Sequence, residues 1–259
     1  MRNNAKTLGW GITLAAVVAV VAAGTVYAAA NSGDGPGAST QLSMEQMRSV
    51  LVPQSELPES RYVSGPMTFV EAAAANAFAA PPSMVFSPQS CATYLEDVLG
   101  PMESLRGWVQ FGSRVDDDHN DNFVHAVVTV PGGANADLLQ KIRSRIFSCQ
   151  TGTLTLEGRV TGAITYTERQ ALSLPGATTL AVTGRTQFSE TPGTEGYKLV
   201  RNYEMPPSAQ FLVDTAQECV ANVNIAGTGD TLIVAMEADL NLANRVATAM
   251  FDQVTALTK

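Results

Sequence analysis

Residues 124–149, VHAVVTVPGGANADLLQKIRSRIFSC, decide the fold class of this chain. A β-rich run leads into a Pro-Gly-Gly turn, and an amphipathic helix follows, capped by Asn135 or Asp137. Residues 232–257, LIVAMEADLNLANRVATAMFDQVTAL, repeat this order of strand, short polar connection and helix. Between the two units the expected strands come in consecutive runs, which favours an antiparallel sheet over a βαβ doubly wound fold. We therefore predict an α+β fold, with helices packed on a mostly antiparallel twisted sheet.

The same periodicities predict further elements on both sides of these units. Helices are expected at 43–52, where Ser43 and Gln46 form a capping box, and at 69–79, 87–99 and 242–257. Strands are expected at 108–115, 123–130, 153–162, 164–171, 179–188, 197–205, 217–226 and 231–237. Since no linker interrupts residues 41–259, we expect them to form one domain.

Composition excludes several classes of protein. The 259 residues include 24 acidic and 16 basic side chains, which gives a net charge of −8, and 45% are apolar. This apolar content excludes a disordered or collagen-like chain. The acidic balance argues against nucleic acid as a partner, because it repels phosphate.

The first 40 residues predict the compartment. Arg2 and Lys6 precede an apolar segment at 7–30, which as a helix would reach about 36 Å and could cross a membrane. This N-terminal apolar helix is either a retained anchor or a signal peptide cleaved after Ala28-Ala29-Ala30. We expect a flexible linker at 31–40. The chain is then single-pass in the cell membrane with residues 41–259 extracytoplasmic, or secreted if 1–30 are cleaved.

Three cysteines are present, at positions 91, 149 and 219. In an exported chain cysteines tend to pair, and sequence alone leaves three pairings open. We favour Cys91–Cys149, because each lies at the end of a predicted helix. Cys219 would then be left over, as a small buried residue rather than a reactive thiol.

Several segments resemble a known family. They are Leu42-Ser43-Met44-Glu45-Gln46-Met47, Ser87-Pro88-Gln89-Ser90-Cys91, Ile146-Phe147-Ser148-Cys149, and the strand at 231–237 that runs into a terminal amphipathic helix. Together they resemble the actinobacterial PknH-like extracellular sensor domain. The resemblance implies a mixed α/β domain with a cleft, which binds something at the cell envelope. This chain departs from the family in lacking a kinase domain, a lipobox and a second cysteine pair, so we expect a stand-alone exported member.

The densest polar cluster is Asp116-Asp117-Asp118-His119-Asn120-Asp121-Asn122. Asp116, Asp118 and Asn120 have the alternate spacing of Ca²⁺ ligands, but an EF-hand would need Gly in place of Asp121 and Glu in place of Val127. We favour a hydrated hairpin loop and expect no metal, with a weak Ca²⁺ site as the alternative.

Catalytic motifs do not emerge from the sequence. His119 and His125 are its two histidines, and no H-E-x-x-H, G-x-S-x-G or G-x-G-x-x-G is present. We expect His125 to be a structural strand residue, and we expect no cofactor and no enzymatic activity. A hydrolase with an unrecognised site would depend on one of these histidines.

Binding is the remaining function. Aromatic residues on or beside strands could line a groove, although core packing is the more common role. The candidates are Trp108, Tyr166, Phe188, Tyr197 and Tyr203, with residues 189–198 as a loop at the rim. We predict a non-catalytic, sensor-like ligand-binding domain, whose partner is a small molecule, a lipid or an envelope protein. The alternative is an accessory subunit of a membrane complex, docked through the N-terminal anchor and an exported face.

Overall fold

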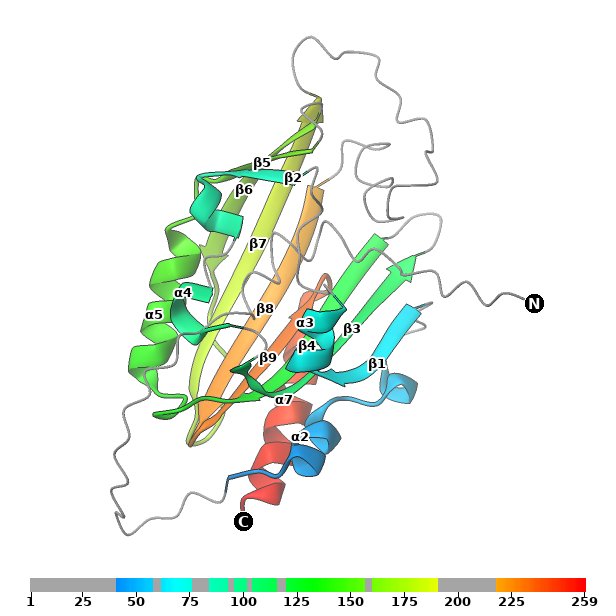
Figure 1. Cartoon of the computed structure of the whole chain (residues 1–259), viewed down its shortest axis with the longest axis vertical. Helices are drawn as coiled ribbons and strands as arrows, with labels where there is room; N and C mark the ends of the chain where they lie inside the picture. Colours follow the sequence, from blue (N-terminus) through cyan, green and yellow to red (C-terminus); the bar gives the residue numbers. More distant parts are fainter. Residues whose placement is uncertain are drawn as a thin grey trace, which may run out of the picture.

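The computed structural model describes residues 41–57, 62–75, 84–92, 96–101, 104–115, 120–156, 160–190 and 218–259 (Figure 1). The predicted apolar helix at 7–30, the linker at 31–40 and the predicted strand at 197–205 lie outside these residues. None of the helices within the described ranges is both long and apolar enough to cross a membrane.

The chain folds into an α+β structure with one nine-stranded sheet. The strands are in the order β1-β3-β4-β9-β8-β7-β6-β5-β2, and every neighbouring pair is antiparallel. Their bounds are β1 Tyr62–Thr68, β2 Met84–Ser87, β3 Arg106–Val115, β4 Asn120–Thr129, β5 Thr153–Leu156, β6 Val160–Glu168, β7 Thr178–Glu190, β8 Glu218–Thr228 and β9 Thr231–Glu237. The predicted fold class is confirmed in this respect.

Helices cover both faces of the sheet. The described helical elements are α2 Met44–Val50, η2 Gln54–Glu56, α3 Phe69–Ala74, η3 Gln89–Ala92, α4 Glu96–Leu99, α5 Ala136–Phe147 and α7 Leu240–Leu257. The sheet has a hydrophobic core on each face. Successive side chains of a strand point to opposite faces, so alternate residues pack in different cores. Val124 and Val128 pack in the core with α3 and α5, on what we name the α5 face. Phe123 and Val127 pack in the core with α2 and α7, on the α7 face.

The two strand–helix units quoted above are neighbours in space. β4 and β9 pair side by side, and their helices cross to opposite faces of the sheet. Figure 1 shows α5 along one long side of the sheet, and α7 beside α2 near the C terminus. The N-cap of α5 is Asn135, whose side chain accepts from the Leu138 N–H, so of the two candidate caps the structure selects Asn135.

Two segments differ from their sequence prediction. The helix predicted at 87–99 is instead the end of β2, then η3 and α4. Phe86 is buried, and pairing of β2 with β5 carries the extended backbone through Ser87. The strand predicted at 153–162 divides into β5 and β6, which pair with each other as a hairpin.

β1 was not predicted at all. It contains Gly65-Pro66, and its register with β3 shifts between Ser64 and Met67. An edge strand with an irregularity tolerates proline, because its outer N–H groups need no partner in the sheet. The helix predicted at 69–79 is described as α3, Phe69–Ala74, with Thr68 and Glu71 in a capping box.

Candidate functional site

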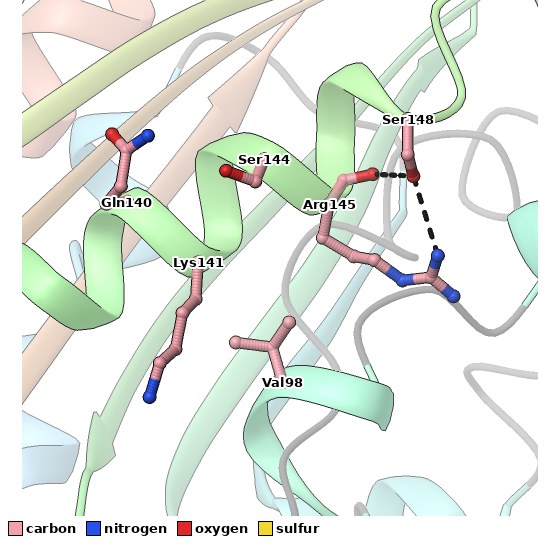
Figure 2. A pocket seen from close by; sticks show the side chains of 6 residues that line it. All are labelled: Val98, Gln140, Lys141, Ser144, Arg145 and Ser148. Atoms are coloured by element: carbon pink, nitrogen blue, oxygen red, sulfur yellow. Dashed lines mark hydrogen bonds between the residues drawn. The ribbon is translucent and has the colours of Figure 1, made fainter.

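A pocket of about 340 Å³ lies between α4 and α5 (Figure 2). Its lining is Val98 from α4 and, from α5 and the residue after it, Gln140, Lys141, Ser144, Arg145 and Ser148. These positions recur at helical spacing, so they share one side of α5. The opposite side of the helix carries Leu139, Ile142 and Ile146 into the core of the sheet. Amphipathic packing of α5 therefore fixes the polar wall of the pocket.

Two of the lining residues are cations, and Figure 2 shows both on the side of α5 that faces α4. The Ser148 hydroxyl donates to the Arg145 carbonyl at 2.7 Å, and an Arg145 guanidinium nitrogen lies 3.5 Å from the same hydroxyl oxygen. These contacts fold the Arg145 side chain along the end of α5. Lys141 lies one helical turn earlier and is exposed.

A third cation of α5, Arg143, lies outside the pocket lining. Its guanidinium donates to Glu168 of β6 at 2.8 Å and lies 5.4 Å from the centre of the Phe147 ring. The Glu168 carboxylate raises the pKa of Arg143, first through this hydrogen bond and then through its charge. Arg143 therefore ties α5 to the sheet.

A disulfide involves the residue that follows Ser148 of the pocket lining. Cys91 of η3 and Cys149, which follows Ser148, are joined with their Cα atoms 5.8 Å apart. Both residues are buried. The bond ties the segment after β2 to the end of α5, and it is the pairing that the sequence favoured. Cys219 lies in β8 opposite Thr186.

A second polar group is buried in the α7 face. His125 Nε2 lies 2.7 Å from Glu237 Oε1, and the two side chains are 0% and 6% exposed. The His125 ring also stacks on Phe123, with ring centroids 4.7 Å apart. Its other nitrogen, Nδ1, is buried without a hydrogen-bond partner. Because His125 is enclosed in this way, a substrate has no path to its ring in this conformation, and its expected structural role fits the geometry.

Neighbouring polar residues hold the junction between β9 and α7. Asn222 donates to the Ala238 carbonyl at 2.7 Å, and Asn224 donates to Asn244 of α7 at 2.9 Å. Asp239 caps α7 by accepting from the Leu242 N–H. These hydrogen bonds, together with the contact between Glu237 and His125, fix the turn between β9 and α7.

Arg169 extends this group from the end of β6. It donates to the Val223 carbonyl and to the Asn224 side chain, both at 3.2 Å. Burial lowers its pKa. The α7 face therefore contains a buried polar network rather than an open site.

The predicted aromatic groove does not form from the described residues. Tyr166 is buried on the α5 face. Trp108 packs on the α7 face, where its Nε1–H donates to the Met44 carbonyl at 2.7 Å and Arg48 lies over its ring. The two rings are thus on opposite sides of the sheet. Phe188 lies in β7, and Tyr197, Tyr203 and residues 191–198 lie outside the described ranges.

The polar cluster at 116–122, predicted to be a hydrated hairpin loop with a weak Ca²⁺ site as the alternative, is only partly described. Residues 116–119, with His119, lie outside the described ranges, whereas Asn120, Asp121 and Asn122 already belong to β4. Three of the seven residues of the predicted loop are therefore part of a strand. Within the described part of the chain, no group of three or more His, Cys, Asp or Glu side chains could hold a metal ion.

The α4–α5 pocket was not predicted. The polar spacing along one side of α5 is visible in the sequence, and it would also fit a solvated helix face. The contact of α4 with α5 is what turns this face into a wall of the pocket, and this contact cannot be predicted from the spacing of residues along the chain.

Solved structures of similar fold include two from mycobacteria. The extracellular domain of PknH from Mycobacterium tuberculosis matches with a TM-score of 0.49 and 16% identity, over 84% of this chain and 99% of that one. An uncharacterised protein from Mycobacterium smegmatis, the Rv0999 ortholog, matches with a TM-score of 0.40 and 14% identity, over 82% and 96%. No family model and no curated protein matches the sequence. These values do not assign the chain to a family.

Proposed function

We propose that this chain is a non-catalytic, exported domain of the cell envelope, which binds a small ligand in the pocket between α4 and α5. The observation that carries this proposal is the buried Cys91–Cys149 disulfide beside the pocket. Such bonds persist in oxidising compartments and are rare in the cytosol. The apolar segment expected at 7–30 supports the same compartment.

The lining of the pocket supports binding rather than catalysis. A serine nucleophile needs an adjacent base within hydrogen-bond reach. The pocket has two serines, and Ser148 donates to a backbone carbonyl while neither serine is hydrogen-bonded to Lys141 in the described structure. Among the side chains that the structure describes, those that line the pocket include no histidine and no carboxylate. Its volume is at the lower end of the range for small-molecule sites, which is about 300–1,000 Å³.

Export is tested by counting thiols in the full-length protein isolated from its own cells. We expect a thiol reagent to label one cysteine, Cys219, in denatured and unreduced protein, and three after reduction. An alkaline phosphatase fused after Lys259 should be active, since this enzyme needs an oxidising compartment. Three thiols without reduction, with an inactive fusion, would remove the exported location.

The second candidate function is that of an accessory subunit of a membrane complex. The length of the apolar segment at 7–30 favours it, because a retained helix of this length could pack against other membrane helices. Extraction of the tagged full chain in mild detergent distinguishes the two candidates. A polypeptide recovered at one copy per chain would favour the subunit. Recovery of the chain alone, with a bound small molecule, would favour the ligand-binding domain.

A further inference from the structure

We draw no further inference here: the strongest candidate, the His125–Glu237 side-chain cluster on the α7 face, belongs to the buried polar network already described, and both side chains are too enclosed to meet a ligand.

Discussion

At the scale of single residues, the contact of His125 with Glu237 joins strands β4 and β9. The two residues are 112 positions apart in the sequence. Both side chains are almost fully buried, so the contact gives His125 Nε2 and Glu237 Oε1 a partner in a region with little access for water. Removing one member of such a pair leaves the other buried without a partner. This lowers stability more than replacing both members with apolar residues of similar volume.

We therefore expect Glu237→Ala to lower the free energy of unfolding by about 3 kcal/mol, measured by urea denaturation. The matched control is Glu168→Ala, which removes a carboxylate from the half-exposed pair with Arg143 and should change stability little. Equal effects of the two substitutions would contradict the account of the buried pair.

Gly112 of β3 provides a second test at this scale. A Cβ at this position would overlap the Phe123 ring, which stacks on His125. Gly112→Ala should displace that ring and cost about 1–3 kcal/mol of stability, as overpacking does. Gly65→Ala is the control, because a Cβ there meets nothing within 4 Å. If Gly112→Ala were as stable as Gly65→Ala, the ring would not be confined as described.

At the scale of elements, the disulfide joins η3 to the end of α5 across 58 positions of sequence. The chain-entropy model gives about 4 kcal/mol for closing a loop of this length. The double substitution Cys91→Ala, Cys149→Ala should lower the free energy of unfolding by about that amount. Reductant alone should shift the urea midpoint of the unsubstituted protein in the same direction. No shift with reductant would show that the bond is absent or adds no stability.

Helix α2 belongs to the core, although it is short and comes directly after the linker expected at 31–40. Met47 is fully buried against α7 and the sheet, and its sulfur accepts from the Thr129 hydroxyl at 3.5 Å. Arg106 donates to the Leu42 carbonyl at 2.9 Å, which fixes the start of the segment.

Met47→Ala should therefore lower the free energy of unfolding by about 2–5 kcal/mol. Met44→Ala, on the same helix but partly exposed, is the comparison and should cost less. Urea denaturation followed by tryptophan fluorescence suits this pair, because Trp108 contacts α2. An unchanged midpoint for Met47→Ala would mean that α2 does not pack on the sheet.

The elements that could be predicted from sequence are those with their own periodicity. α5 and α7 are amphipathic helices. β9 is apolar from Leu232 to Met236, and β4 is apolar from Phe123 to Val128 except at His125, so local spacing suffices. β1 and β2 are edge strands interrupted or flanked by proline, and their extended form depends on pairing with β3 and β5. The α4–α5 pocket and the His125–Glu237 contact depend on which strands become neighbours, and spacing along the chain does not contain that information.

At the scale of the whole molecule, the chain carries a net charge of −8, and both cores that hold it together are apolar. Salt weakens the interaction between exposed charges, but it has little effect on apolar packing. The thermal unfolding midpoint should therefore change little as sodium chloride is raised.

The measurement that tests the central claim most directly is native mass spectrometry of the full-length chain, extracted from its own cells in mild detergent. The account predicts a single polypeptide, lighter by two hydrogens than its fully reduced form, with a non-covalent small ligand. That ligand should be absent from Lys141→Gln and retained by Arg143→Gln. A stoichiometric protein partner without a small ligand, or a fully reduced chain, would contradict the claim.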